Sequence, residues 1–274
     1  MKLTALVSTN EQLKAVLSAS CPLSRVILES SVSEPEGWAE RAECVRTSGK
    51  EVCFAFPPVF QEQARQYFLK HLPLLQKCGF QGFLLRSLEE FAFCSENGLN
   101  GLFQADHSIY AFNSEAKSVL LQGGFGLLTV PLEHSYKDTL QMGAKEMEMI
   151  VYGYVPMMIS HNCVHATLEG CDHKRRMLVL KDRLSHDMVH VNDCRFCLST
   201  IYNCVPTYLL DCGKELRNLD PASLRLSFTI ESMEETQRIL RLAEEAMRAY
   251  PIGLSGPAYG NKGFTRGHFR NSVE

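Results

Sequence analysis

Strand-like and helix-like segments alternate along almost the whole chain, and this alternation is the strongest constraint on its fold. Short apolar runs are followed by segments whose apolar residues recur at helical spacing. The eight strand-like runs lie at residues 3–8, 25–30, 51–57, 82–87, 101–113, 125–133, 146–159 and 223–230. Strands that alternate with helices in this way are typical of parallel sheets.

Eight such units predict a closed (β/α)8 barrel of the TIM type, in which each strand is followed by a helix on the outside. A chain of 274 residues is long enough for one such domain, so we predict a single barrel domain over residues 1–274. An open, doubly wound sheet remains the alternative, because the number of units does not exclude it.

The eighth strand-like run is delayed. The segment 156–219 separates it from the seventh and contains two short alternating runs, MLVLKD at 177–182 and MVHVND at 188–193, which are typical of hairpin strands. We therefore predict a Cys-rich hairpin insertion after strand seven, and we assign residues 251–274 to a C-terminal tail.

Helix ends can also be predicted. The segment 60–79 is expected to form one helix that stops at Gly79, where glycine is a common C-terminal cap. Ser87 and Glu90 have the spacing of a capping box at the start of the next helix. The segment 232–250 is the most clearly amphipathic, with an apolar face of Met233, Ile239, Leu240, Leu242, Ala243, Ala246 and Met247.

Charge and hydropathy exclude several classes of protein. The net charge of −3 provides no overall basic field, so any contact with nucleic acid has to use a local patch. The N-terminal segment lacks an apolar run of signal-peptide length, and no stretch approaches the roughly 20 apolar residues of a membrane span. We expect a cytoplasmic protein with no membrane partner.

In a barrel, the carboxyl ends of the strands meet at one rim, where catalytic residues are found. The polar residues at these ends are Thr9, Asn10, Glu29, Ser30, Arg86, Ser87, Asp106, His107, Glu133 and His134. We take Arg86, Asp106, His107 and Glu133 as the candidate catalytic residues, because a carboxylate beside an imidazole can orient a base or bind a polar substrate. Neighbouring strand residues point to opposite faces, so one member of each pair is expected to point inward.

The eleven cysteines fall into two groups. A long chain with an odd number of cysteines and no export signal does not favour disulfides. Five cysteines are scattered through apolar segments of the first hundred residues, and we expect them to be small packing residues: Cys21, Cys44, Cys53, Cys78 and Cys94. The other six lie between Cys163 and Cys212.

Four of these six have the spacing of a metal or cluster site. Cys163, Cys171, Cys194 and Cys197 form the pattern C-x7-C-x22-C-x2-C, in which a hairpin could bring two pairs of thiolates together. Four thiolates suit zinc or an iron–sulfur cluster, and the C-x2-C pair alone also occurs in redox dithiols. Cys204 and Cys212 lie outside the pattern. A histidine could replace one thiolate, and five are close in sequence: His161, His165, His173, His186 and His190.

Four sequence motifs resemble the collagenase-like peptidase family, U32. They are MIVYGYVPMMISHNCV, LVLKDR, NDCRFCLSTIYNCVPTYLL and the C-terminal GFTRGHF, and LLTVPLE matches the family's strand that ends in Glu133. The resemblance extends over most of the chain and is most specific between Met149 and Leu210.

The resemblance implies two different activities. Some members are described as collagenases or peptidases, whereas others take part in oxygen-independent hydroxylation of tRNA or rRNA bases or of ubiquinone precursors. For the hydroxylating members it implies a [4Fe-4S] cluster on Cys163, Cys171, Cys194 and Cys197, prephenate as the oxygen-donating co-substrate of the RNA branch, and a paralogous protein partner. A Zn²⁺ ion on the same thiols, in a barrel without catalytic activity, is the third possibility.

The motifs favour the hydroxylase. The sequence contains neither H-E-x-x-H nor G-x-S-x-G, so nothing in it demands a hydrolase. Basic residues interleaved with aromatic residues suit a flexible RNA strand. The insertion contributes Lys174, Arg175, Arg176, Lys181, Arg183 and Arg195 to such a surface, and the tail contributes Lys262, Phe264, Arg266, Phe269 and Arg270.

Overall fold

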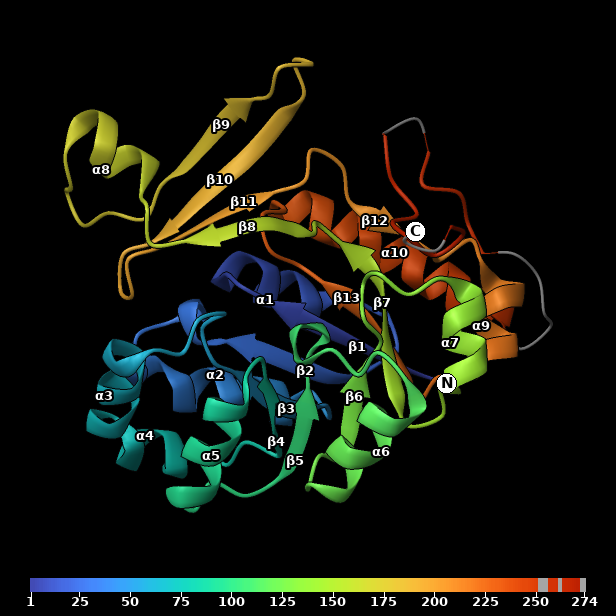
Figure 1. Ribbon diagram of the computed structural model, residues 1–274, viewed down its shortest axis with the longest axis horizontal. Helices are drawn as coiled ribbons and strands as arrows, with labels where there is room; N and C mark the ends of the chain where they lie inside the picture. Colours follow the sequence, from blue (N-terminus) through green and yellow to red (C-terminus); the bar gives the residue numbers. More distant parts are fainter. Residues whose placement is uncertain (251–255, 261–262, 272–274) are drawn as a thin grey trace.

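A closed barrel of eight parallel strands forms the body of the molecule (Figure 1). The computed structural model describes the whole chain except residues 251–255, 261–262 and 272–274. The barrel strands are β1 (Lys2–Val7), β2 (Leu23–Glu29), β3 (Glu51–Ala55), β4 (Gly82–Leu85), β5 (Leu102–Ala105), β6 (Leu127–Thr129), β7 (Met147–Gly153) and β13 (Ser223–Ser227). The pairing of β6 with β7 closes the sheet, so the (β/α)8 barrel is confirmed and the open sheet is excluded.

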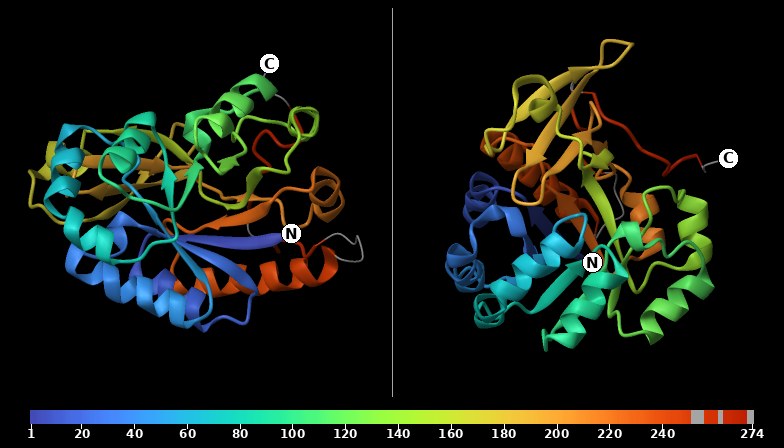
Figure 2. Two further views of the ribbon diagram at one scale, coloured as in Figure 1. Left: turned by 90° about the horizontal axis from the view of Figure 1, so that it is seen from below. Right: turned by 60° about the vertical axis from the view of Figure 1, so that its left-hand side comes forward.

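Helices cover the outside of the barrel (Figure 2). They are α1 (Asn10–Ser18), α2 (Pro35–Thr47), α3 (Glu62–Lys70), α4 (Leu72–Lys77), α5 (Leu88–Glu96), α6 (Ser114–Gln122), α7 (Tyr136–Met142), α9 (Gly213–Leu219) and α10 (Met233–Ala249). Within the described residues, no helix is both long and apolar enough to cross a bilayer.

The single helix predicted over 60–79 is wrong, because α3 ends at Lys70 and α4 begins at Leu72. Pro73 lies in the first turn of α4, where it has no N–H to donate and where its ring would clash with the carbonyl group four residues earlier in a continuous helix. The predicted stop at Gly79 is confirmed, since this residue follows the C-cap of α4 with a φ of 64°.

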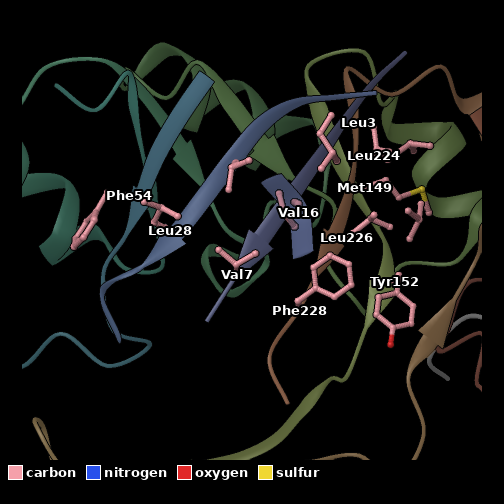
Figure 3. Close-up of a cluster of buried hydrophobic side chains, with 14 of the residues drawn as sticks. Leu3, Val7, Val16, Leu28, Phe54, Met149, Tyr152, Leu224, Leu226 and Phe228 are labelled. Carbon is pink, nitrogen blue, oxygen red and sulfur yellow. The ribbon is translucent and has the colours of Figure 1, made fainter. Parts of the chain in front are cut away.

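Two apolar cores are separated by the wall of the barrel. The larger one fills the space between the strands and the helices, where Leu3, Val7, Leu28 and Phe54 pack in Figure 3. The smaller one lies inside the barrel and consists of Leu6, Ile27, Cys53, Ala55 and Leu84, all from β1 to β4. Alternation along each strand produces this division, because successive side chains point to opposite faces.

Most of the predicted packing residues lie in these cores. Cys21, Cys53, Cys78 and Cys94 are buried, as expected, but Cys44 is exposed. It lies on the part of α2 that faces away from the core, where Trp38, Ala42 and Val45 supply the buried side chains instead. On α10, Ile239, Leu240, Ala243 and Ala246 are buried, whereas Met233 at the first turn is 38% exposed.

The other half of the barrel interior is polar. Its buried side chains include Thr4, Arg25, Gln104, Thr129, Glu148, Ser223 and Arg225. The carboxylate of Glu148 accepts hydrogen bonds from Thr4 Oγ1 (2.8 Å), Ser223 Oγ (2.8 Å) and Gln104 Nε2 (2.6 Å). Arg225 forms ion pairs with Asp106 (2.5 Å) and Glu148 (3.3 Å), and its side chain is only 1% exposed. Charge is therefore matched in the middle of the barrel.

A second, antiparallel sheet is inserted between β7 and β13 and lies over one end of the barrel (Figures 1 and 2). It contains β8 (Pro156–Ser160), β9 (Met177–Lys181), β10 (Asp187–Asp193) and β11 (Leu198–Tyr202), in the order β8-β11-β10-β9, with helix α8 (Val164–Glu169) after β8. The hairpin of β9 and β10 confirms the predicted pair of strands.

The strand predicted over 146–159 is divided between the two sheets. β7 ends at Gly153, which has a φ of 154°, and β8 starts at Pro156. A Cβ atom on Gly153 would lie 2.7 Å from the carbonyl oxygen of Ser227, so only glycine allows the chain to leave the barrel at this point. Beyond the insertion, β12 (Thr207–Tyr208) pairs antiparallel with β7.

The described part of the tail packs against the barrel. Thr265 forms a β-bridge with Thr207, and the Arg266 guanidinium forms an ion pair with Asp211 that includes a 2.6 Å contact between Nη2 and Oδ2. Phe269 is buried, with its ring centroid 5.9 Å from that of Tyr136. These residues are therefore part of the folded body, and Lys262 lies outside the described residues.

We predict that Arg225→Met lowers the free energy of unfolding by about 3–5 kcal/mol, because it leaves Asp106 and Glu148 as buried carboxylates without their shared cation. Urea denaturation measures the change. Arg248→Met removes an arginine whose side chain is 75% exposed in its pair with Glu244, and it should change the same quantity by less than about 0.5 kcal/mol. Equal effects of the two substitutions would contradict the prediction.

Candidate functional site

A cavity of about 180 Å³ lies at the carboxyl ends of the barrel strands, beneath the inserted sheet. Arg86, Asp106 and His107 line it from the barrel, and Arg175 and Asp193 line it from the insertion. Three of the four candidate catalytic residues therefore line one cavity. The insertion forms the opposite wall.

Arg86 is held in place by two carboxylates and a carbonyl group. Its guanidinium donates to both oxygens of Glu29, with Nη1 3.0 Å from Oε2, and its Nε lies 3.2 Å from Asp106 Oδ2. Nη1 also donates to the carbonyl oxygen of Phe56 at 2.5 Å. Burial disfavours the charge of this group, but Glu29 and Asp106 outweigh burial and raise the pKa of Arg86 above its ordinary value. The side chain is a permanent cation with little freedom to move.

Asp106 links the two buried arginines. It lies between Arg86 and Arg225, and it also accepts the backbone N–H of His107 at 2.9 Å. Burial alone would raise the pKa of Asp106, but the charges of Arg225, His107 and Arg86 lower it well below its usual range. Asp106 therefore remains a carboxylate at neutral pH and serves to position its neighbours.

His107 is the cavity residue best suited to accept a proton. Burial, reinforced by the charges of Arg225 and Arg86, lowers the pKa of its imidazole, although Asp106 and Glu133 oppose this shift. The expectation that one member of the Asp106–His107 pair points inward is wrong, because both line the cavity. β5 ends at Ala105, and the 3-10 helix η2 (His107–Ile109) begins directly afterwards, so strand alternation no longer applies.

Glu133 lies in a neighbouring cleft of about 510 Å³, together with His134 and the tail residues 265–269. His107 lines both the cavity and this cleft. Among the described residues, Glu133 Oε2 has no hydrogen-bond partner, and His134 Nε2 donates to the carbonyl oxygen of Phe112 at 3.1 Å. The candidate residues thus occupy two adjoining spaces that meet at His107.

Glu90, which we expected to complete a capping box with Ser87, contacts the backbone of Arg86 instead. Ser87 Oγ accepts from Glu90 N at 3.2 Å, which is the first half of the expected capping box. The second half is missing, because Glu90 Oε2 instead accepts the backbone N–H of Arg86 at 2.5 Å. Burial is the largest influence on this group and raises the pKa of Glu90 to about 8.

All four cysteines of the predicted pattern converge on one end of the inserted sheet. Cys194 and Cys197 lie in the turn that joins β10 to β11, where Asp193 pairs with Leu198. Ser160 at the end of β8 pairs with Ser199, so Cys163, which follows β8, lies at the same end of the sheet. Met177 at the start of β9 pairs with Val191, so the preceding loop with Cys171 also lies at this end. In Figure 1, α8 stands beside this end.

The donor set fits a thiolate-bound group in chemistry and in location. Burial, followed by the charges of Cys171 and Cys163, raises the pKa of Cys194, which indicates that these three thiols act on one another. A metal or iron–sulfur cluster relieves such repulsion because it binds the thiolate forms. In the described part of the chain, no three His, Cys, Asp or Glu side chains already form a metal-binding group.

The turn with Cys194 and Cys197 is fixed to the rim of the barrel. Phe196 is buried against Phe68, with ring centroids 5.9 Å apart, and the Arg195 guanidinium donates to Ser30 O and Glu34 Oε1, both at 2.8 Å. Asp193 and Leu198, which flank the turn, line the cavity. The cysteine end of the insertion therefore adjoins the candidate active site.

Among the remaining residues, His173 lies next to the four-cysteine pattern, with its Nδ1 3.7 Å from Cys171 Sγ, whereas Cys212, His165 and His186 lie beside carboxylates. Cys212 is buried beside Asp211 and Arg266. His165 lies 3.3 Å from Glu169 and 3.4 Å from Asp172, and His186 lies 3.0 Å from Asp182. Replacement of a thiolate by one of the histidines stays an untested hypothesis.

The predicted basic surface is only partly exposed. Three of its arginines form ion pairs: Arg195 with Glu34, Arg266 with Asp211, and Arg176 with Asp172. Lys174, Arg175, Lys181 and Arg183 are exposed on the insertion. A contact with RNA would therefore use the insertion more than the tail.

Sequence reasoning missed Arg225 and Glu148, although a signal was present. Both are charged residues in the middle of apolar runs, SLRLSF and EMEMIV, at the alternating positions that point into a barrel. A charged residue at such a position needs a partner of opposite charge inside the barrel.

Among the known proteins compared with this chain, only solved structures match, and one of these belongs to a peptidase family. No family model and no curated protein sequence matches the chain. The solved structure of the U32 peptidase Mk0906 matches 85% of this chain and 94% of its own, with a TM-score of 0.51 and 10% identity. This structural neighbour agrees with the resemblance seen in the sequence. At such low identity, the likeness shows the fold alone.

Other barrel enzymes are less similar. A chitinase from Rhizomucor miehei covers 90% of this chain and 100% of its own with a TM-score of 0.48 and 10% identity. A tryptophan synthase from M. tuberculosis covers 90% and 93%, with a TM-score of 0.48 and 8% identity.

We predict that Glu90 makes the protein less stable as the pH rises from about 5 to 8. The folded protein keeps a proton on Glu90 up to a pKa of about 8, whereas the unfolded chain loses it near 4.5, so stability falls through this window by at most about 1.4 kcal/mol per pH unit. Glu90→Gln keeps an acceptor for Arg86 N–H but does not titrate.

Urea denaturation at several pH values measures the effect. The advantage of the Glu90→Gln variant over the wild type should grow from about pH 5 to pH 8. Glu231, whose pKa burial raises to about 7, contributes in the same direction in both proteins and cancels in the comparison. A constant difference across this range would show that Glu90 is already ionised in the folded protein.

Proposed function

We propose that this protein is an iron–sulfur protein of the U32 family that hydroxylates an RNA base without molecular oxygen. The observation that carries the proposal is the shared wall: Asp193 and Leu198, which flank the turn of Cys194 and Cys197, line the same cavity as Arg86, Asp106 and His107. A redox group on these thiols would stand next to the cavity rather than in a remote structural module.

Cys163, Cys171, Cys194 and Cys197 are the residues that would hold the [4Fe-4S] cluster. When bound, such a cluster supplies electron transfer at a potential set by its surroundings. The cavity residues have other roles. Asp106 and Glu29 keep Arg86 aimed at the cavity, and the neutral imidazole of His107 can accept a proton from a substrate.

Prephenate, the oxygen source that the family resemblance implies, is an anion. The exposed guanidinium of Arg175 lines the cavity from the insertion side, where it can pair with a carboxylate. RNA would bind to the insertion, because Lys174, Lys181 and Arg183 are exposed on it. The insertion thus provides both contacts.

Peptidase activity receives less support from the geometry. Asp106 is held as a carboxylate between two arginines, and the four thiols, if they bind one metal ion, leave no open position for a catalytic water. A structural zinc on the same thiols would hold the insertion together without chemistry. Metal analysis separates these possibilities.

We predict that protein purified without oxygen is brown and contains about four iron and four sulfide ions per chain. Cys163→Ser and Cys197→Ser should lose most of this iron, whereas Cys44→Ser, at an exposed helix position, should keep it. Metal and sulfide analysis measures both. A colourless protein with one tightly bound zinc per chain overturns the iron–sulfur proposal. Release of peptides from gelatin that Glu133→Gln abolishes would favour the peptidase.

We predict that Lys174→Glu and Arg183→Glu each weaken binding of tRNA or rRNA fragments and lower the slope of log affinity against log salt by about 1, because each removes a contact to a phosphate. Filter binding at several salt concentrations measures this. Lys14→Glu, an exposed substitution on α1, is the matched control and should change the affinity little. Equal loss in all three variants would indicate a general effect of charge.

A further inference from the structure

Asn192 is a buried polar residue at the centre of the cysteine end of the inserted sheet. It is the last residue but one of β10, and its side chain is 3% exposed. Its amide oxygen accepts the backbone N–H of Arg176 at 2.5 Å. Its amide nitrogen donates to the carbonyl oxygen of Lys174 at 3.0 Å and to Cys194 Sγ at 3.2 Å.

These partners fix the orientation of the amide. The Arg176 N–H can only donate, so the Asn192 oxygen must face it, and the nitrogen must then face Lys174 O and Cys194 Sγ. Both hydrogens of the amide nitrogen and the oxygen are used. A buried amide whose oxygen and both N–H groups are hydrogen-bonded holds its neighbours in one arrangement.

The contacts join two cysteine-bearing segments that are far apart in the sequence. Lys174 and Arg176 belong to the loop that carries Cys171, and Cys194 begins the turn that carries Cys197. The same loop reaches the segment of Cys163, because Asp172 lies 3.4 Å from His165 on α8. Asn192 therefore lies where the chain segments of all four thiols meet.

The bond to Cys194 has a consequence for a redox group. A hydrogen bond donated to a cysteine sulfur stabilises negative charge on it, and the reduced state of an iron–sulfur cluster carries more negative charge than the oxidised state. Such a bond raises the reduction potential. It also favours the thiolate that binds the cluster.

We infer that Asn192 is a positioning residue for the cluster: it holds the Cys171 loop against the Cys194 turn and raises the cluster potential through its N–H···S bond. This inference rests on the proposed function, since it assumes that the four thiols bind a cluster. It adds the residue that sets the potential.

Two substitutions separate the roles of the amide. Asn192→Asp keeps an oxygen for Arg176 N–H but removes the donor to Cys194, and Asn192→Ala removes both. Ser199→Ala is the matched control, because Ser199 is buried, pairs with Asn192 across the sheet, and has no hydrogen-bond partner for its hydroxyl among the described residues.

The measurements are the midpoint potential of the cluster, the rate at which a chelator removes iron, and hydrogen exchange of the Arg176 amide in the metal-free protein. We expect a lower potential and severalfold faster iron loss in both Asn192 variants, and none of these changes in Ser199→Ala. Arg176 N–H should exchange faster in Asn192→Ala and stay protected in Asn192→Asp. Because the aspartate also brings a negative charge that lowers the potential, the lost donor is tested by the fall in potential in Asn192→Ala, and the acceptor by the difference in Arg176 exchange between the two variants.

Failure of the inference differs from failure of the proposed function. Wild-type protein that binds a cluster, with unchanged potentials in both Asn192 variants, overturns the inference alone. Wild-type protein that binds zinc instead overturns the proposed function and the effect on potential. In that case, unchanged zinc release and unchanged Arg176 exchange in Asn192→Ala would also exclude the positioning role.

Discussion

The charge network inside the barrel is the constraint on which the rest of the site depends. Asp106 stands between Arg86 and Arg225, and Glu148 and Glu29 complete the pairing on either side. Buried charges persist only when they are paired and hydrogen-bonded, so each member fixes the position of the next. Apolar side chains fill one half of the barrel interior, and the charge network fills the other half. It also presents Arg86 and His107 at the mouth of the barrel, where burial lowers the pKa of His107 and the carboxylates of Glu29 and Asp106 raise that of Arg86.

The inserted sheet turns this mouth into a cavity. Phe196 and Arg195 anchor the turn of Cys194 and Cys197 on the rim of the barrel, and Gly153 lets the chain leave β7 at the required angle. The same sheet gathers four thiols at one end through the register of its strands. The attachment that encloses the cavity thus also places the thiols beside it. For this reason, the proposed redox group and the proposed substrate site would adjoin each other, separated by the residues Asp193 and Leu198.

Much of the fold could be predicted from the sequence because strand and helix periodicities are local. The eight barrel strands, the hairpin of β9 and β10, and the cap at Gly79 all follow from such patterns. Two errors in the bounds of elements arose where one residue overrides a pattern: Pro73 divides a helix, and Gly153 divides a strand. The ring of Pro73 was a readable signal. The close approach of Gly153 to Ser227 depends on a strand about seventy residues away, and no local pattern contains it.

By itself, the sequence determined the eight strand–helix units, the place of the insertion and the four-cysteine spacing, because these depend on order and periodicity along the chain. The pairing of β6 with β7, which only the tertiary structure contains, decided that the sheet is a closed barrel. Only the tertiary structure decided that Arg86, Asp106 and His107 share a cavity while Glu133 lies in the adjoining cleft. It also decided that Glu90 serves the backbone of Arg86 and that Asn192 joins two cysteine segments. Hydrogen bonds and burial act over a few ångströms in space, and closing the barrel brings together residues that the sequence separates.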